Sequence, residues 1–333
     1  MNYKESEQIL KEVKKAKKIL INCHRSPDAD SVGSSLALYQ VIKNLGKDVK
    51  VICPSNVHED LKFLPHSDAI EKINFRRFDF GAYDLFICLD SAGTNMVTGD
   101  EKIKLPNIPI IVIDHHKTNT KYGKINLVDS KVSSTAEILF LVLEDWRIKT
   151  DKNLATLLLA GILGDTGVFQ YPGVTTRTME IGIKLMQKGV NKDEIIFNLS
   201  RSINYNEVKF WGEVLERMQK DDDYKFVWSA IPYEVFEKYA SPESAKESAA
   251  SMFTQCVKDT NFGMVMVEET KGNLSVSLRS RTGFDVSKIA LGLGGGGHNN
   301  AAGGKVSGRE FREAVETVLN IARKIVDENT KKN

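Results

Sequence analysis

The amino-terminal part of the chain alternates short apolar runs with helical patterns, and this alternation constrains the fold more than any other feature. The apolar runs have the composition of buried strands and are "KILINC" (18–23), "DVKVIC" (48–53), "YDLFICLD" (83–90) and "IPIIVID" (108–114). Helical patterns, such as that of residues 31–46, lie between them. Strands that alternate with helices predict an α/β fold with a parallel sheet covered by helices. Sheets of this kind bind ligands at the carboxyl ends of their strands.

The length of 333 residues and the change of pattern along the chain predict two domains. The alternation ends near residue 187, so residues 1–187 form the first predicted domain. Residues 188–222 have helical patterns and reach the acidic "KDDD" at 220–223, so we expect a helical linker there. Residues 223–333 contain two strand patterns that can pair as a hairpin, with helices around them, and predict a smaller α/β domain.

The charge and the cysteine content narrow the class of protein. The chain has 46 basic and 44 acidic residues and a net charge of +2. It therefore lacks the excess of basic residues that a protein needs to bind long nucleic acids. Its four cysteines are widely spaced and form no Cys-x-x-Cys pair, which favours a reducing compartment. The longest apolar runs are too short to cross a membrane. We therefore expect a cytoplasmic protein that binds neither membranes nor long nucleic acids.

Acidic residues and histidines gather where the predicted strands end. Taken singly, such an aspartate can cap a helix or form a turn, and such a histidine can be an ordinary, partly buried side chain. Taken together, so many carboxylates at one sheet edge repel one another unless cations neutralise them. The candidate ligands are His24, Asp28 and Asp30 after the first run, Asp90 after the third, His115 after the fourth, and Asp165 at the end of a helical pattern.

A pair of divalent metal ions explains this group of side chains. Two ions roughly 3.5–4 Å apart suit a set of about six carboxylate and imidazole ligands. One carboxylate must then be shared, and Asp90 follows a central strand of the predicted sheet, so we expect it to bridge the ions. Mixed oxygen and nitrogen ligands favour Mn²⁺ over Mg²⁺, which prefers oxygen ligands alone.

The same residues resemble the motifs of the DHH phosphoesterase family. "HRSPDAD" (24–30), "DSA" (90–92), "DHH" (114–116) and "GDT" (164–166) are similar to the four DHH motifs in order and spacing. The stretch "SLRSRTGFDVSKIALGLGGGGHNNAAGG" (277–304) is similar to the DHHA1 signature, which ends in Gly-Gly-Gly-His. The two-domain length resembles the nanoRNase type, which comprises oligoribonucleases and phosphoadenosine-phosphate phosphatases. Relatives of this type act on cyclic di-AMP or on linear pApA, and the resemblance also implies a homodimer.

The resemblance implies roles for individual residues as well. Asp114 would orient the histidines, and His116 would face the scissile phosphate or the leaving oxygen. Asn299 departs from the pattern, in which a basic residue is more common at this position. Both ions would share Asp90, and the remaining ligands would be His24 and Asp28 for one ion and Asp30, His115 and Asp165 for the other.

The glycine-rich run at 292–304 can also be interpreted simply as a flexible loop. Its backbone N–H groups are of the kind that form anion-binding nests, and no Walker A or dinucleotide-binding pattern accompanies it. We expect this run to hold a terminal phosphate or a base of the substrate. Arg281 can point to the same face of a strand as the arginine two residues before it. The substrate-binding residues that we expect are Arg279, Gly295, Gly296, Gly297 and His298.

These patterns predict a Mn²⁺-dependent phosphodiesterase of short nucleotides. A hydroxide formed on the ion pair would cleave di- to pentanucleotides or cyclic dinucleotides to mononucleotides. The candidate substrates are pApA, nanoRNA, cyclic di-AMP, pGpG and pAp. Two alternatives stay open: a pyrophosphate or polyphosphate hydrolase with the same metal core, and a nucleotide sensor without catalytic activity.

Overall fold

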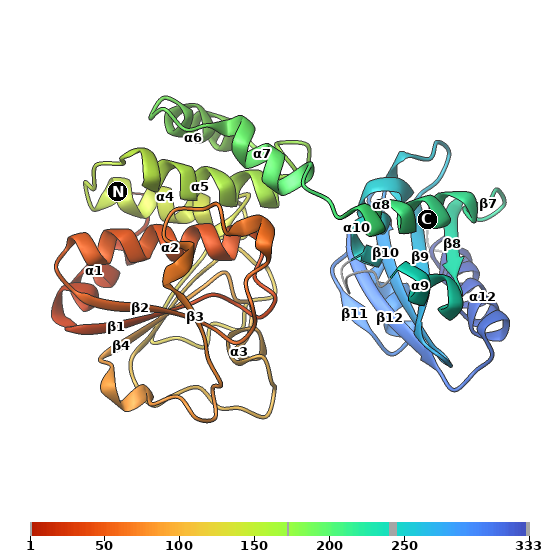
Figure 1. Cartoon of the computed structure of the whole chain (residues 1–333), viewed down its shortest axis with the longest axis horizontal. Coiled ribbons are helices and arrows are strands. Elements are labelled where there is room, and N and C mark those ends of the chain that lie inside the picture. Colours follow the sequence, from red (N-terminus) through yellow and green to blue (C-terminus); the bar gives the residue numbers. More distant parts are fainter. Residues whose placement is uncertain (1, 172, 240–244, 331–333) are drawn as a thin grey trace. The chain divides into compact units, whose positions relative to one another are not determined.

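The computed structural model describes residues 2–171, 173–239 and 245–330. The chain divides into two compact units, Met1–Ser202 and Ile203–Asn333, and each unit has its own sheet (Figure 1). Among the described residues, no helix combines the length and the apolar character that a membrane-spanning segment needs.

The first unit is built on a sheet of six strands in the order β3-β2-β1-β4-β5-β6. Every strand pair is parallel, which confirms the predicted α/β fold. The strand order reverses between β1 and β4, and in such sheets the ligand site lies at this switch point. The strands are β1 (Lys18–Asn22), β2 (Asp48–Cys53), β3 (Ile70–Lys72), β4 (Leu85–Leu89), β5 (Ile110–Asp114) and β6 (Ile125–Val128).

The two faces of this sheet are covered differently. Ile19 and Ile21 of β1 belong to a large core that also contains apolar residues of α1, α2, α4 and α5. Leu20 and Phe86 point to the opposite face, where α3 and the segment 73–83 cover them. The helices are α1 (Glu5–Lys15), α2 (Ala29–Asn44), α3 (Thr94–Thr98), α4 (Thr135–Asp145), α5 (Lys152–Asp165), α6 (Thr176–Met186) and α7 (Lys192–Ser200), with 3₁₀ turns at Glu59–Leu61, Ser67–Ala69 and Phe80–Ala82.

Helices α2 and α5 cross very closely because glycines face the contact. A Cβ atom at Gly33 would lie 2.4 Å from the backbone oxygen of Leu157, and one at Gly164 would lie 2.7 Å from Ala29 Cβ. No side chain fits at either position, so the two backbones can approach each other. The crossing brings the first turn of α2, which contains Asp30, beside the last turn of α5.

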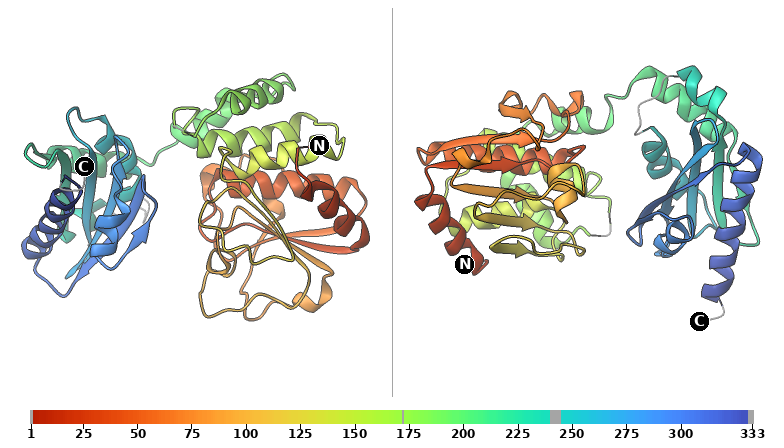
Figure 2. Two further views of the ribbon diagram at one scale, coloured as in Figure 1. Left: turned by 180° about the vertical axis from the view of Figure 1, so that it is seen from behind. Right: turned by 90° about the horizontal axis from the view of Figure 1, so that it is seen from below.

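The second unit has a mixed sheet of six strands in the order β11-β12-β10-β9-β8-β7. Among the strand pairs in the described part of this unit, only β8 and β9 are parallel. Val318 and Leu319 of α12 pack on one face of this sheet, where Figure 2 shows the helix, and Phe210 and Trp211 of α8 pack on the other. The elements are α8 (Tyr205–Glu216), β7 (Gln219–Asp221), β8 (Phe226–Ile231), α9 (Tyr233–Tyr239), α10 (Ala245–Phe253), a 3₁₀ turn at Thr254–Cys256, β9 (Phe262–Thr270), β10 (Asn273–Ser280), α11 (Ser287–Gly292), β11 (Gly296–Gly297), β12 (Ala301–Ser307) and α12 (Phe311–Thr330).

The structure differs from the expected helical linker at 188–222. Helix α7 packs on α5 with Ile195 buried in the core of the first unit, whereas α8 belongs to the second unit. The unit boundary therefore falls between Ser202 and Ile203, within the expected linker. The acidic stretch from residue 220 does not separate the units either, because β7 pairs there with β8 through its backbone.

Candidate metal centre

Two of the predicted ligands follow strands that meet at the switch point. His24 follows β1 and Asp90 follows β4, the two strands between which the order reverses. The backbone of Asp90 is left-handed, with φ of 53°, a conformation that aspartate adopts more readily than most residues. Both side chains are buried, Asp90 with 2% and His24 with 6% of the residue exposed.

His24, Asp28 and Asp90 form the first group of potential ligands. His24 Nε2 lies 3.4 Å from Asp90 Oδ2 and 3.6 Å from Asp28 Oδ1. The other ring nitrogen, Nδ1, lies 2.8 Å from the backbone oxygen of Arg25 and must donate to it, because a carbonyl only accepts. In neutral His24 this contact leaves Nε2 without a proton, which is the state that a metal ligand needs.

Asp30, His115 and Asp165 form a second group, with potential ligand atoms within 4.8 Å of one another. His115 Nε2 lies 3.0 Å from Asp165 Oδ2 and 3.5 Å from Asp90 Oδ1. This nitrogen is buried, and its contacts lack the geometry of a hydrogen bond within the described part of the chain. A buried nitrogen that faces two carboxylates without a hydrogen bond is the arrangement expected of a ligand whose partner is a cation.

Asp114 connects the two adjacent histidines. Its Oδ1 accepts the backbone N–H of His115 at 2.9 Å and lies 2.8 Å from Nδ1 of His116. Its Oδ2 accepts from the side-chain amide of Asn119 at 2.6 Å, and the same amide contacts the backbone oxygen of Ser91. The His116 ring is therefore held in one orientation beside Asp90, whose Oδ1 lies 3.6 Å from Nδ1.

The proton affinities of these groups reflect a surplus of buried negative charge. Burial and the neighbouring Asp90 and Asp165 raise the pKa of Asp30 well above its ordinary value. Burial also raises the pKa of Asp165 to about 6. Although burial opposes it, contact with Asp165 raises the pKa of His115 to about 10. Asp28 and Asp90 likewise raise the pKa of His24 well above its ordinary value, again against the effect of burial. Without cations the cluster therefore retains protons.

The donor set fits divalent cations. Neighbouring oxygen and nitrogen ligands of a six-coordinate ion lie about 3 Å apart when its bonds are about 2.1 Å long. The contacts of His24 and His115 with the carboxylates, at 3.0–3.6 Å, are close to this spacing. Asp90 belongs to the group of His24 and Asp28 and also forms a third group with His115 and His116. Its Oδ2 lies toward His24 and its Oδ1 toward His115, which links this third group to Asp30 and Asp165. The structure thus brings the six predicted ligands together: His24, Asp28, Asp30, Asp90, His115 and Asp165.

Two residues at this site have no motif in the sequence that singles them out. Asn119 holds Asp114, as described above, and Thr135 donates from its hydroxyl to Asp90 Oδ1 at 3.0 Å. The one local signal for Thr135 is the "SSTAE" pattern at 133–137, which is typical of a helix start. That pattern predicts the beginning of α4 but not the contact with a distant aspartate.

Arg279 and Arg281 of the second unit do not share a strand face. Arg279 lies in β10 and donates to Ser251 Oγ at 2.8 Å, whereas Arg281 lies beyond the strand and donates to the backbone oxygen of Thr260. The expected alternation fails because β10 ends at Ser280 and the backbone N–H of Arg281 turns toward Asn261. Only Arg279 keeps the position that the strand pattern predicts.

The glycine-rich run forms a close backbone pairing. Gly296 and Gly297 are the short strand β11, paired with β12. A Cβ atom at Gly295 would lie 2.1 Å from the backbone oxygen of Gly303, and Gly297 has φ of 142°. His298 begins the exposed turn between the strands and donates its N–H to Ala301 at 2.7 Å. The close pairing of the backbones explains why glycines stand at these positions. Phosphate binding by the run stays a prediction.

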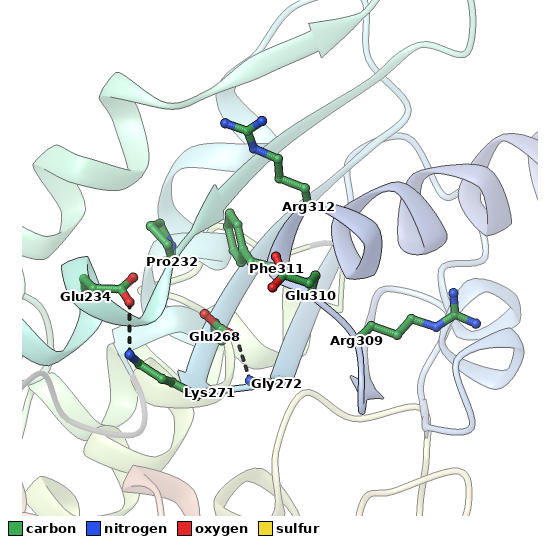
Figure 3. A pocket seen from close by; sticks show the side chains of 9 residues that line it. All are labelled: Pro232, Glu234, Glu268, Lys271, Gly272, Arg309, Glu310, Phe311 and Arg312. Atoms are coloured by element: carbon green, nitrogen blue, oxygen red, sulfur yellow. Dashed lines mark hydrogen bonds and ion pairs between the residues drawn. The ribbon is translucent and has the colours of Figure 1, made fainter.

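A hollow of about 510 Å³ lies elsewhere on the second unit (Figure 3). Three of its charged side chains already have partners: Glu268 accepts backbone N–H groups of Tyr233 and Gly272, and Lys271 pairs with Glu234 at 3.4 Å. A second hollow, of about 460 Å³, lies in the first unit beside Phe75. Neither is lined by a predicted site residue, so the strand-end cluster is the stronger candidate.

Comparisons with known proteins identify the family of the chain. The model of the DHH family, N-terminal domain, matches residues 18–162, and that of the DHHA1 domain matches residues 232–326. The chain belongs to the DHH phosphoesterase family and carries a DHHA1 domain, as its motifs predict.

Particular relatives match most of the chain. The bifunctional oligoribonuclease and PAP phosphatase NrnA of Thermus thermophilus is 30% identical over 334 residues, which cover 96% of this chain and 94% of that protein. The cyclic-di-AMP phosphodiesterase GdpP of Bacillus subtilis is 26% identical over 91% of this chain, but the match covers only 47% of that protein. The crystal structure of an exopolyphosphatase-related protein from Bacteroides fragilis has a TM-score of 0.87 at 27% identity, with 97% of this chain and 96% of that chain covered.

Proposed function

We propose that this chain is a Mn²⁺-dependent phosphodiesterase that hydrolyses short nucleotides to mononucleotides. The observation that carries the proposal is the set of three overlapping ligand groups at the switch point of the first sheet, two of which contain Asp90. The NrnA relatives are named as oligoribonucleases and PAP phosphatases, and GdpP is named as a cyclic-di-AMP phosphodiesterase. All of these activities cleave phosphoester bonds.

In this proposal the two ions share Asp90, and each has its own further ligands. When bound, the ions supply a water of lowered pKa and neutralise charge on the phosphoryl oxygens. His116 lies beside the ligands with its Nδ1 against Asp114, and we assign it to the phosphate or the leaving oxygen. The ligand assignment is His24 and Asp28 for one ion and Asp30, His115 and Asp165 for the other.

Residues of the second unit hold the far end of the substrate in this proposal. Arg279 offers a permanent positive charge, which suits a terminal phosphate. The exposed turn at His298 offers a histidine next to backbone N–H groups. The net charge of +2 supports short substrates, because long nucleic acids are bound through many phosphate contacts. The proposed substrate-binding set is Arg279, Gly295, Gly296, Gly297 and His298.

The decisive experiment compares rates on a panel of substrates. Purified protein loaded with Mn²⁺ is assayed with pApA, pGpG, pAp, cyclic di-AMP and a pentanucleotide, next to pyrophosphate and polyphosphate. We expect nucleotide substrates to be cleaved to mononucleotides, and chelation of the metal to abolish the reaction. Binding of these nucleotides without turnover would instead identify a sensor.

Polyphosphate hydrolysis is the second candidate function. It is favoured by one observation, the similarity over nearly the whole chain to the protein titled exopolyphosphatase-related. The same panel separates the two functions: phosphate release from polyphosphate or pyrophosphate, with no cleavage of any nucleotide, would replace the proposed activity by this one.

The proposal includes a cytoplasmic homodimer. The free cysteines of the described residues, three of them buried, support a reducing compartment. The dimer is implied by the family resemblance alone, and sedimentation equilibrium of the purified protein tests it. A mass close to that of one 37.2 kDa chain would contradict it.

A further inference from the structure

We propose that Thr135 is a positioning residue for the shared carboxylate of Asp90. Thr135 is the first residue of α4 and has no exposed surface. Its hydroxyl lies 3.0 Å from Asp90 Oδ1. An ionised carboxylate can only accept a hydrogen bond, so the hydroxyl donates and its proton fixes the direction in which Oδ1 points.

The same helical turn holds a second acidic ligand. The backbone N–H of Thr135 donates to Asp30 Oδ2 at 2.6 Å, and that of Ala136 donates to Oδ1 at 2.8 Å. The first N–H groups of a helix have no partner within the helix, and its amino terminus carries a partial positive charge. One turn of α4 therefore holds carboxylates that come from α2 and from the end of β4.

The turn is itself held in place by bonds that do not involve the metal centre. Ser134 caps α4 and accepts the N–H of Glu137. Glu137 is buried, and its carboxylate accepts from Ser133, from the hydroxyl of Thr178 and from the guanidinium of Arg177. The position of Thr135 is thus set before any cation binds.

This arrangement matters because Asp90 faces both groups of ligands. Its Oδ2 lies toward His24 and its Oδ1 toward His115, so rotation of the carboxylate would change both groups at once. The hydroxyl of Thr135 opposes that rotation. The inference rests on the proposed function, since it requires that the cluster bind cations.

The test measures Mn²⁺ binding to metal-free protein and does not depend on catalysis. Thr135→Val keeps the shape of the side chain and removes the hydroxyl, whereas Thr135→Ser keeps the hydroxyl. Free Mn²⁺ is followed by its EPR signal during a titration, and thermal unfolding of each metal-free variant is recorded. Thr98→Val is the matched control, because Thr98 is 4% exposed and its hydroxyl donates to the backbone oxygens of Thr94 and Asp100.

We expect Thr135→Val to weaken Mn²⁺ binding by about 10- to 100-fold, the range typical of residues that orient metal ligands. Thr135→Ser and Thr98→Val should bind Mn²⁺ like the wild type. Equal binding by Thr135→Val and the wild type would overturn the inference and leave the proposed function intact. If the wild type itself did not bind Mn²⁺, that result would instead contradict the proposed function.

A second pair of variants serves if Thr135→Val does not fold. Thr135→Ser and Thr135→Ala both lose the methyl group and differ by the hydroxyl alone. Weaker Mn²⁺ binding by Thr135→Ala than by Thr135→Ser supports the inference. Equal binding by the two, whether strong or weak, overturns it.

Discussion

The carboxylate of Asp30 lies directly against Gly161 of α5: a Cβ atom at position 161 would stand 2.7 Å from Asp30 Oδ1. The same Cβ would stand 2.7 Å from Ala136 Cβ, in the turn of α4 that holds Asp30. A glycine inside a helix is unfavourable by about 1 kcal/mol relative to alanine. At position 161 it is explained by the space that Asp30, a proposed metal ligand, needs.

Gly161→Ala should therefore weaken the metal centre. The added methyl group must displace Asp30 or α4, and overpacking of this kind costs about 1–3 kcal/mol. We expect lower Mn²⁺ affinity in calorimetric titrations. Gly212→Ala is the control, because Gly212 lies within α8 and a Cβ atom there meets nothing within 4 Å. An unchanged Mn²⁺ affinity in Gly161→Ala would show that Asp30 and α4 can move to make room for the methyl group, and would contradict this prediction.

Removing the charge of the shared carboxylate should disable both ion sites. Asp90→Asn keeps the size of the side chain but offers an amide where a bridging carboxylate is needed. Mutation of a residue that only orients a metal ligand typically costs up to about 100-fold in metal affinity or activity. Because Asp90 is itself a proposed ligand, we expect its replacement to reduce activity by more than that. Bound manganese, measured by mass spectrometry of the metal content, should fall in parallel.

Asp48→Asn provides the matched control for this change. Asp48 is exposed at the amino end of β2, whereas the candidate ligands follow the carboxyl ends of the strands. It should keep wild-type activity and metal content. Wild-type turnover by Asp90→Asn after removal of the metal would refute the metal-dependent mechanism.

Mn²⁺ binding should strengthen as the pH rises. Contact with Asp165 raises the pKa of His115 to about 10 against the effect of burial, so at neutral pH the metal-free protein holds a proton there. A cation must displace that proton, and binding at higher pH costs less. Calorimetry in buffers of different ionisation enthalpy should detect the protons that are released. Affinity that is independent of pH between about pH 6 and pH 9 would contradict this assignment.

The same shift predicts the stability of the metal-free protein. The folded pKa of His115, about 10, lies above its ordinary value of 6.5, so the charged ring stabilises the fold. This contribution is fully present below pH 6.5 and is lost as the pH rises toward about 10. Thermal unfolding should therefore occur at a lower temperature at about pH 9 than at pH 6.5, and saturating Mn²⁺ should reduce the difference.

Glu137→Gln should destabilise the first unit. Glu137 has no exposed surface, and its Oε2 accepts from Ser133 and Thr178. An amide nitrogen at that position cannot accept these bonds, and the charge opposite Arg177 is lost as well. We expect a loss of about 2–4 kcal/mol in the free energy of unfolding, measured with urea. The control is Glu144→Gln on the same helix, where Glu144 forms an exposed ion pair with Lys184. Loss of this ion pair should lower the free energy of unfolding by at most about 1 kcal/mol.

The main features of the fold could be predicted because the central strands of the first sheet are largely apolar. The run that contains β4 has no polar residue between Leu85 and Leu89, and its end is marked by Asp90. The short strands β3 and β7 were not predicted, since "IEK" and "QKD" pair at sheet edges through their backbones and bury little side-chain surface. Strand β6 was also overlooked, because only one of its four residues is buried.

For the candidate site, the sequence indicates only which residues could be ligands. Each ligand follows a recognisable strand or helix, so its place at the sheet edge can be deduced from local pattern. Thr135, Asn119 and Gly161 act through contacts with residues distant in the chain, and nothing in their local sequence reports such contacts. The roles of these residues depend on how α4 and α5 pack, and that became visible in the structure alone.

The ligand cluster draws on four separated parts of the chain, at residues 24–30, 90, 114–116 and 165. No stretch of unfolded chain can imitate it, so the proposed ions recognise the native state almost exclusively. Manganese at about one hundred times its dissociation constant would then shift the folding equilibrium by about 2.7 kcal/mol toward the native form. The supply of this metal in the surroundings would thereby govern the lifetime of the enzyme as well as its turnover.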